Sequence, residues 1–287
     1  MFFIAGITGK VGGAAARTLL EAGRPVRALV RDPQKASDWA RRGVELQQGD
    51  FTDAASIAAA LDGVEAAFLM LPPLLAPQPG FPEAKAMIAS YRAALHQTPP
   101  PRLVLLSSFG SERDSGLGLI TATHLMEQAL SDLPMPTAVI RAGCFLDNFV
   151  YERARAASSG LFDSLLAPTD RSVPMIASGD IGREVARLLT GNWSGKKIVE
   201  LGTPFSPDEL ARAMSEALGR PVEARTIPPE ARPARLEAMG LTPETSGPYE
   251  EMWEGVNTGW IDFGAPGSER VAATTTPAAF FAAAWQG

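Results

Sequence analysis

The sequence predicts a doubly wound α/β fold: a parallel sheet covered by helices, with a smaller C-terminal α/β lobe. Two observations support this prediction. Short apolar runs alternate with helical segments at a spacing of roughly 20 residues, which is typical of parallel strands joined by crossover helices. The first apolar run, Phe2 to Ala5, leads directly into three glycines and then into a helical segment. This order indicates a strand, a tight turn and a helix.

The turn after the first strand has three glycines spaced three residues apart. The turn and the start of the helix contain Gly6, Thr8, Gly9, Lys10, Val11 and Gly12. Glycine lets the backbone approach a phosphate, and the N–H groups of a helix start attract one. The spacing is Gly-x-x-Gly-x-x-Gly rather than the standard dinucleotide fingerprint Gly-x-Gly-x-x-Gly. A tight turn without a ligand is the alternative, but the position between strand and helix favours a phosphate site.

The second strand, from Pro25 to Val30, ends at Arg31-Asp32-Pro33. In dinucleotide-binding folds an acidic residue at this place bonds the ribose 2′-hydroxyl of NAD, whereas an arginine accommodates the 2′-phosphate of NADP. Since Arg31 comes first and its guanidinium suits a phosphate, we expect NADP(H), with Lys10 as a further positive charge. A solvated surface charge is the alternative for Arg31.

The chain then continues the alternation of strands and helices. Further strands are expected at 44–47, 66–71, 103–106 and 137–140, and helices at 34–42, 53–61, 83–96 and 121–130. In parallel sheets the ligand lies over the carboxyl ends of the strands. The candidate site therefore extends from the glycine turn and Arg31 to the other strand exits, which are Asp50, Phe51, Leu71, Pro72, Ser107, Ser108, Cys144 and Phe145.

Beyond residue 145 the pattern changes, so we expect a dinucleotide-binding Rossmann domain at 1–145 and a smaller substrate-binding lobe at 146–287. A helix is expected at 147–157, a loop at 160–174 and a helix at 180–189. A strand near 196–202 should return to the main sheet, and Ser206 should cap a helix that ends at Leu218. The last 60 residues contain Tyr249, Trp253, Trp260 and Phe263. These aromatic residues either line a substrate pocket or, as we favour, pack the lobe.

Composition excludes several classes of protein. The net charge is −6, which disfavours binding to nucleic acid or acidic membranes. One cysteine, Cys144, allows no intrachain disulfide, and two histidines allow no histidine metal cluster, so we expect no metal. Neither a targeting segment nor a membrane span is visible, and we expect a cytoplasmic protein.

Several segments together resemble one known family. They are GITGKVGG, VRALVRDPQKA, GDFTD, LVLLSSFG, HLMEQALSDLPMPTAVIRAGCFLDNF, DIGREVARLLTG and IVELGTPFSPDELARAMSEALGRPV. With them the chain resembles NmrA-like members of the atypical short-chain dehydrogenases, a group that includes quinone and triphenylmethane reductases. The resemblance covers about residues 2–225.

The resemblance implies NADP(H) across the strand ends. The glycine turn would hold the pyrophosphate and Arg31 the 2′-phosphate. Asp50 would reach the adenine edge with Phe51 beside it, and Leu71-Pro72 would pack near the ribose. The Ser107-Ser108 and Cys144-Phe145 pairs would lie near the nicotinamide; ordinary packing at strand ends is the alternative for these last three pairs.

One feature departs from the wider superfamily. Its active members use Tyr-x-x-x-Lys, in which the lysine lowers the tyrosine pKa for proton donation to a carbonyl. No tyrosine of this chain has a lysine four residues later, and the two positions fall at Leu119 and Thr123. His124, beside the second position, could donate a proton or orient a substrate; a packed or solvated histidine is the alternative. Hydride transfer to a conjugated acceptor needs less acid help.

Two functions remain open on the sequence alone. The first is an NADP(H)-dependent oxidoreductase that reduces a quinone-like or other conjugated small molecule, aromatic or quinoid, without a Tyr–Lys pair. The second is a non-catalytic NAD(P)-binding redox sensor of the NmrA type, which regulates a protein partner. A homodimer is compatible with both. The resemblance to the bacterial reductases favours the enzyme.

Overall fold

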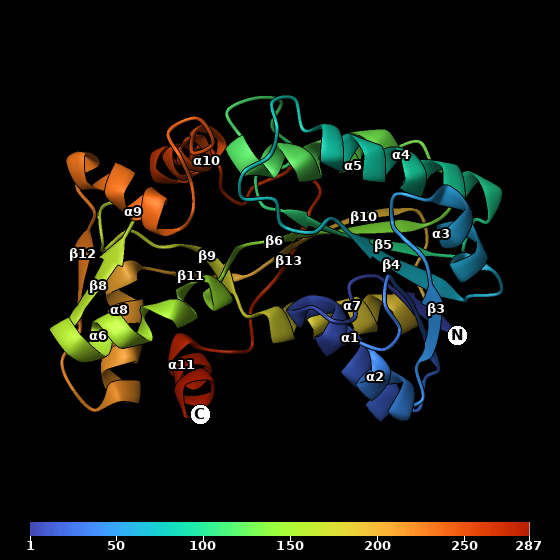
Figure 1. Ribbon diagram of the computed structural model, residues 1–287, viewed down its shortest axis with the longest axis horizontal. Helices are drawn as coiled ribbons and strands as arrows, with labels where there is room; N and C mark the ends of the chain where they lie inside the picture. Colours follow the sequence, from blue (N-terminus) through green and yellow to red (C-terminus); the bar gives the residue numbers. More distant parts are fainter. Residues whose placement is uncertain (287) are drawn as a thin grey trace.

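The computed structural model describes residues 1–286 and contains a central eight-stranded parallel sheet (Figure 1). The strand order is β13-β10-β6-β5-β4-β1-β2-β3. The strands are β1 (Phe2–Ile4), β2 (Val26–Val30), β3 (Glu45–Gln48), β4 (Ala66–Met70), β5 (Leu103–Ser108), β6 (Thr137–Ala142), β10 (Lys196–Leu201) and β13 (Glu269–Val271). The chain adds β2 and β3 on one side of β1 and then adds β4, β5 and β6 on the other side. This change of side is the doubly wound arrangement that the sequence predicts.

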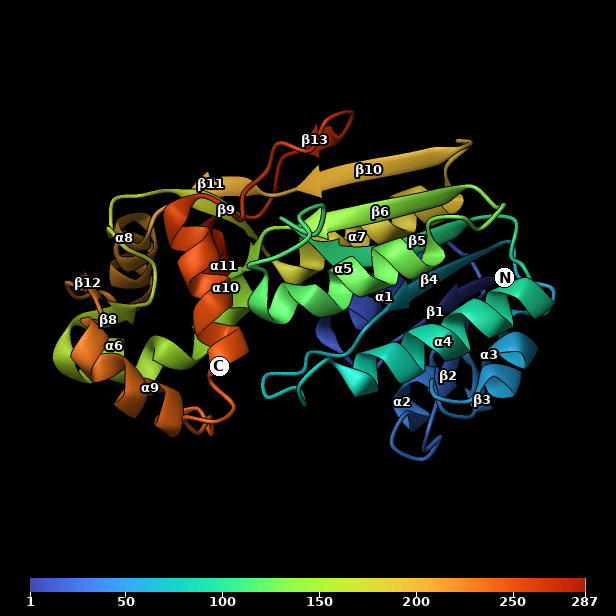
Figure 2. The same ribbon diagram turned by 90° about the horizontal axis from the view of Figure 1, so that it is seen from above.

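Helices cover both faces of this sheet (Figures 1 and 2). On one face lie α1 (Lys10–Glu21), α2 (Ser37–Arg41) and α7 (Ser178–Thr190). On the other lie α3 (Ala54–Leu61), α4 (Pro82–Gln97) and α5 (Thr121–Leu130). Strand residues alternate between the two cores: Phe2 packs on the α1 side and Phe3 on the α4 side. Because both faces are buried at the centre of the sheet, the central strands β1 and β4 are apolar throughout.

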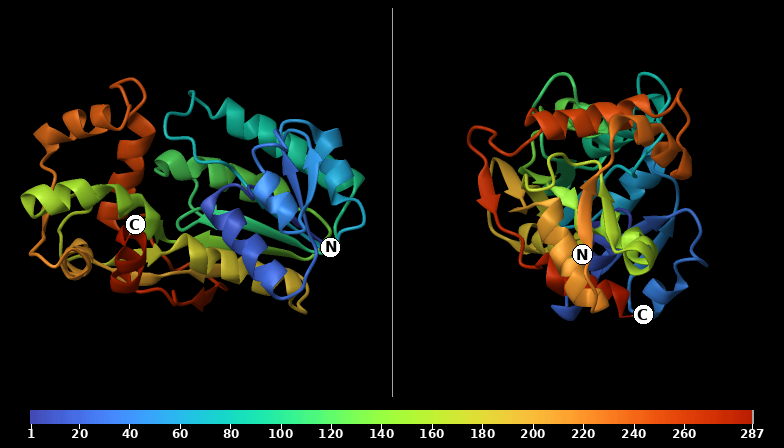
Figure 3. Two further views of the ribbon diagram at one scale, coloured as in Figure 1. Left: turned by 60° about the horizontal axis from the view of Figure 1, so that its bottom comes forward. Right: turned by 90° about the vertical axis from the view of Figure 1, so that its left-hand side faces the viewer.

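The smaller lobe lies beyond the carboxyl ends of the strands (Figures 1 and 3). It contains a three-stranded sheet of β7 (Cys144–Phe145), β9 (Val173–Ile176) and β11 (Thr203–Phe205), and a pair formed by β8 (Leu161–Ser164) and β12 (Glu223–Thr226). Its helices are α6 (Arg153–Ser159), α8 (Pro207–Leu218), α9 (Arg232–Ala238), α10 (Gly247–Thr258) and α11 (Pro277–Trp285). A third apolar core fills the lobe.

One local expectation for the lobe is wrong, and another is confirmed only in part. The segment 160–174, expected as a loop, contains β8 and the start of β9. β8 is only four residues long and its partner β12 is distant in the sequence, so it leaves little periodic signal. The helix expected at 147–157 begins as the 3₁₀ helix η2 (Leu146–Glu152) and becomes α-helical only at Arg153.

Three elements from the second half of the chain belong to the eight-stranded sheet or to the helices that cover it. β10 pairs with β6 along its whole length, which confirms the predicted returning strand. The sequence predicts neither β13 at the sheet edge nor the packing of α7 on α1. These two helices approach closely at Gly182, where a Cβ would lie 2.4 Å from the Cβ of Ala14. No helix within residues 1–286 is long and apolar enough to span a bilayer.

Candidate functional site

A cleft of about 880 Å³ opens at the carboxyl ends of β1, β2 and β4. Seven of the predicted site residues line it: Gly6, Thr8, Gly9, Arg31, Asp50, Phe51 and Pro72. The remaining lining residues are Ala5, Ile7, Leu29, Val30, Asp32, Lys35, Thr52, Met70, Pro73, Met87 and Tyr91. The structure thus brings the first turn, the end of the second strand and the end of the third strand together.

The glycine turn has the backbone geometry of a phosphate cradle. Gly6 has φ of +66°, which favours glycine, and a Cβ at Gly12 would lie 2.4 Å from the Gly6 carbonyl oxygen. α1 follows with Gly9 as its N-cap, so no side chain caps the helix, and its first turn holds no acidic residue. The first N–H groups of α1, at Lys10, Val11 and Gly12, therefore lack the usual side-chain acceptor. Such a helix start suits an anion.

Arg31 is exposed in the cleft directly after β2. Within residues 1–286 no carboxylate forms an ion pair with its guanidinium. The neighbouring Asp32 is engaged in its own turn: its Oδ1 accepts from the Gln34 N–H at 3.0 Å, and its Oδ2 lies 4.0 Å from the Lys35 Nζ. Lys35, which sequence analysis missed, adds a second cation to the same end of the cleft. Its spacing of four from Arg31 is the signal that could have found it.

Hydrogen bonds and ring packing hold the cleft wall on the β3–β4 side together. The Asp50 carboxylate accepts from the Thr52 hydroxyl at 2.7 Å and from the Thr52 N–H at 2.8 Å, and these bonds hold the Asp50 pKa below its usual value. Phe51 packs edge-on against Tyr91, with ring centroids 6.0 Å apart, and the Tyr91 hydroxyl donates to the Met70 carbonyl at 2.8 Å. Leu71, by contrast, packs in the apolar core on the α4 side.

The predicted residues of β5 and β7 do not line this cleft. The Ser107 hydroxyl is buried and donates to the Glu127 carboxylate, and Ser108 is half-buried at the end of β5. Cys144 is buried, and burial raises the pKa of its thiol to about 12, so the thiol is neutral near pH 7. Phe145 packs partly buried on the α1-side core.

A buried charge cluster behind Ser107 was missed by sequence analysis. Arg141 on β6 donates to Glu127 at 2.6 Å and to Glu112 at 3.0 Å. The register pairs Ser107 with Arg141, and Arg141 with Glu200 of β10. Arg141 stands just beyond the expected end of its strand, where an arginine is ordinarily exposed. Its residue type therefore gave no sign of a buried ion pair. Within residues 1–286, no group of three or more His, Cys, Asp and Glu side chains is placed to hold a metal ion.

Neither position of the Tyr–Lys pair carries an acid. Leu119, in the 3₁₀ helix η1 (Gly118–Ile120), packs in the apolar cluster around Tyr249. The Thr123 hydroxyl lies 2.9 Å from that of Ser111. Beside it, the His124 Nδ1 lies 2.9 Å from the Ser111 carbonyl oxygen. A carbonyl oxygen can only accept a hydrogen bond, so Nδ1 is the ring nitrogen that donates here.

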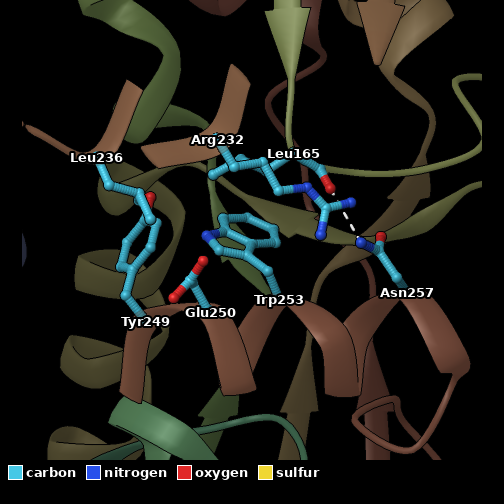
Figure 4. A pocket seen from close by; sticks show the side chains of 7 residues that line it. All are labelled: Leu165, Arg232, Leu236, Tyr249, Glu250, Trp253 and Asn257. Atoms are coloured by element: carbon cyan, nitrogen blue, oxygen red, sulfur yellow. Dashed lines mark hydrogen bonds between the residues drawn. The ribbon is translucent and has the colours of Figure 1, made fainter. Parts of the chain in front are cut away.

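The four C-terminal aromatic residues take part in three different contacts and do not form one cluster. Tyr249 packs edge-on against Trp253, Phe263 against Phe109, and Trp260 under Arg113. Beside Tyr249 and Trp253 lies a cavity of about 20 Å³, also lined by Arg232 and Asn257 (Figure 4). That volume holds one water molecule rather than a ring. These contacts favour packing of the lobe over a preformed aromatic pocket.

Comparison with known proteins identifies the family. A model described as the NmrA-like family matches residues 2–246, which is most of the chain. The chain belongs to this family. The resemblance inferred from the sequence motifs is thereby confirmed.

Relatives and solved structures agree on the fold. The NAD(P)H azoreductase of Xenophilus azovorans is 26% identical over 255 residues, which cover 88% of this chain and 86% of that protein. The crystal structure of an NADPH-dependent quinone oxidoreductase from Escherichia coli, in complex with NADPH, has a TM-score of 0.81 at 22% identity and covers 100% of both chains. Citrobacter sp. triphenylmethane reductase in complex with NADP(H) has a TM-score of 0.74 at 22% identity, covering 88% and 90%.

Proposed function

We propose that this protein is an NADPH-dependent oxidoreductase that reduces a quinone-like or other conjugated small molecule by hydride transfer. One observation carries the proposal: the uncapped start of α1 and the guanidinium of Arg31 face the same cleft of about 880 Å³. Each of these two features by itself suits an anion. NADPH has two anionic groups, the pyrophosphate and the 2′-phosphate, so it can offer one to each feature. The family relatives, named as azo and quinone reductases, support the proposal.

Each part of the dinucleotide has candidate partners at the carboxyl ends of the strands. The backbone of Gly6 to Gly12 would hold the pyrophosphate, and Arg31 with Lys35 the 2′-phosphate. Asp50 and Phe51 would contact the adenine, and Leu71-Pro72 the ribose. The nicotinamide would lie towards Ser107-Ser108 and Cys144-Phe145, at the side where the lobe meets the sheet.

The chain offers few side chains that could act as a general acid in the reaction. When bound, NADPH supplies the hydride, and the acceptor takes up its two electrons together with one proton. Leu119 and Thr123 cannot act as the Tyr–Lys pair, so the substrate should be one whose rings delocalise the added charge. His124, in its imidazolium form and with its Nδ1–H donated to the Ser111 carbonyl, is the side chain that we assign to deliver the remaining proton from Nε2; it would then regain a proton from solvent.

Arg31→Ala tests the cofactor assignment. A charge-assisted contact is worth about 1.5–3 kcal/mol, so the Kd for NADPH should rise about tenfold to a hundredfold while that for NADH barely moves. Fluorescence titration of both nucleotides measures this, with Arg24→Ala, at a surface position outside the cleft, as the control. Equal losses for NADPH and NADH would contradict the 2′-phosphate role.

A redox sensor is the second candidate, and the occupation of the Tyr–Lys positions by Leu119 and Thr123 favours it. Loss of NADPH absorbance in the presence of quinones and azo dyes separates the two functions. Turnover establishes the enzyme. Tight binding of NADPH, weaker binding of NADP⁺ and no turnover would establish the sensor, and a protein partner would then be sought.

A further inference from the structure

The first residue of α1 makes a contact that leads away from the cleft. Lys10 belongs to the glycine turn, yet its side chain is not part of the cleft wall. Its Nζ lies instead 3.2 Å from Oδ1 of Asp147, which belongs to η2 at the start of the lobe. One ammonium therefore joins the phosphate turn to the lobe.

Asp147 has other partners that keep it in place. Only 10% of its side chain is exposed. Its Oδ1 accepts from the Ser178 hydroxyl and its Oδ2 from the Ser178 N–H, both at 2.9 Å, at the start of α7. Both carboxylate oxygens therefore remain hydrogen-bonded if the lysine leaves. The side chain of Lys10, by contrast, is 55% exposed, so it can exchange this partner for another at small cost.

We propose that Asp147 is a positioning residue that holds Lys10 outside the cleft, and that Lys10 moves to the dinucleotide pyrophosphate when the cofactor binds. This inference rests on the proposed function. A pyrophosphate at the start of α1 offers two negative charges beside the backbone of Lys10 itself, whereas Asp147 offers one charge that is already shared with Ser178. Cofactor binding then releases the ionic contact between α1 and the lobe that covers the nicotinamide end.

The proposal makes an unusual prediction for Asp147→Asn. Removing the competing charge frees Lys10, so NADPH should bind more tightly, by about fivefold at low ionic strength, and the gain should shrink with added salt. Lys10→Gln should weaken NADPH binding by about the same factor. In the Lys10→Gln background, Asp147→Asn should change nothing, since the residue acts through the lysine. Fluorescence titration gives the Kd for NADPH of the wild type, of the two single variants and of the double variant.

Ser178→Ala is the matched control. It removes a hydrogen bond to the same carboxylate but leaves the charge that holds Lys10, so NADPH affinity should stay at the wild-type value. The inference is overturned if Asp147→Asn fails to tighten binding, if the gain persists in the Lys10→Gln background as a direct charge effect, or if Ser178→Ala reproduces it. Failure of the wild-type protein to bind NADPH would instead overturn the proposed function itself.

Discussion

The helices α1 and α8 both begin after an N-cap residue with extended backbone, but their first turns are built differently. In α8 the Ser206 hydroxyl accepts from the Glu209 N–H at 3.2 Å, and the Glu209 carboxylate accepts from the Ser206 N–H at 2.8 Å. In α1, Gly9 offers no side chain at all. The capped helix satisfies its own N–H groups, whereas the uncapped one leaves them for a ligand.

The start of α7 shows a third arrangement. A carboxylate from elsewhere in the chain, Asp147, accepts from the Ser178 N–H, and Asp180 lies in the first turn. Negative charge at this helix start comes from the protein itself. From these three helices we infer that a helix start lacking both a cap and an acid, when it faces a cleft, predicts an anion site by a physical cause that glycine spacing alone does not supply.

Gly12→Ala should break the α1 end most severely. The new Cβ would lie 2.4 Å from the Gly6 carbonyl oxygen and 2.5 Å from that of Ala5. These are backbone atoms that cannot rotate away, so we expect a loss of about 3 kcal/mol or more in the free energy of unfolding, with loss of NADPH binding. Chemical denaturation and nucleotide titration measure the two effects.

Gly219→Ala is the control for that change. Gly219 ends α8 with φ of +65°, and no other group lies within 4 Å of the position that its new Cβ would take. Only the cost of the left-handed backbone applies, about 1 kcal/mol, and NADPH binding should be unchanged. A Gly12→Ala protein as stable as this control, with normal binding, would refute the cradle.

Gly9→Asp should convert the α1 start into one that resembles α8. Gly9 is extended, with φ of −89° and ψ of 178°, so an aspartate can cap the helix there once the Gly6 carbonyl oxygen, 3.2 Å from the new Cβ, shifts by a few tenths of an ångström. Its carboxylate occupies the N–H groups and repels phosphate. We expect the Kd for NADPH to rise about tenfold or more, with stability changed by only a few tenths of a kcal/mol.

The neutral cap Gly9→Ser separates the two causes of that loss. It should weaken NADPH binding less than aspartate does, because it competes for the N–H groups without adding charge. Unchanged affinity in both variants would mean that the phosphates do not contact this helix start.

Asp180→Asn tests the α7 end and its dependence on pH. Burial raises the Asp180 pKa, but hydrogen bonds from Thr274 and Thr275 outweigh burial and hold it below the usual 3.8. With the folded pKa below the unfolded one, the stabilisation is complete above about pH 4 and is lost as the pH falls through the folded value. The substitution should lower the free energy of unfolding by about 2 kcal/mol at pH 7.

The pH series supplies the check. The difference between wild type and Asp180→Asn should shrink as the pH is lowered below about 4, because the wild-type carboxyl then becomes protonated too. A difference that stays constant as the pH falls well below about 4 would show that the charge of Asp180 is not what stabilises the segment.

Ser206→Ala should give the smallest effect. It removes one side of the capping box of α8, which costs about 1 kcal/mol of stability. Because this helix end lies in the lobe and its N–H groups face no cleft residue, the Kd for NADPH should not move. A change in affinity would show that α8 helps to shape the cofactor site.

Local patterns predicted the central strands of the large sheet and the start of the lobe helix α8. Apolar strands such as β4 and β5, and the Ser206 capping box, are recognisable within a few neighbouring residues. The same holds for the cleft: the glycine turn, Arg31 and Asp50 stand where a parallel sheet must bring its strand ends together.

The features that the sequence did not reveal depend on partners distant in the chain. β13 has three residues, two of them charged, and it is a strand only because β10 lies beside it. The role of Asp147 depends on Lys10 and Ser178, which come from other elements. No window of neighbouring residues contains such pairs, so periodicity and capping rules cannot find them.

The order of the strands has a consequence for synthesis. β6 lies inside the sheet, but its neighbour β10 and the helix α7, which covers the α1-side core, leave the ribosome only after the first part of the lobe, from β7 to β9. A nascent chain that ends near residue 145 therefore exposes an unpaired strand edge and uncovered apolar side chains. The cofactor half can therefore be completed only after α7 and β10 have emerged, and a chain truncated near residue 145 should aggregate rather than bind a nucleotide.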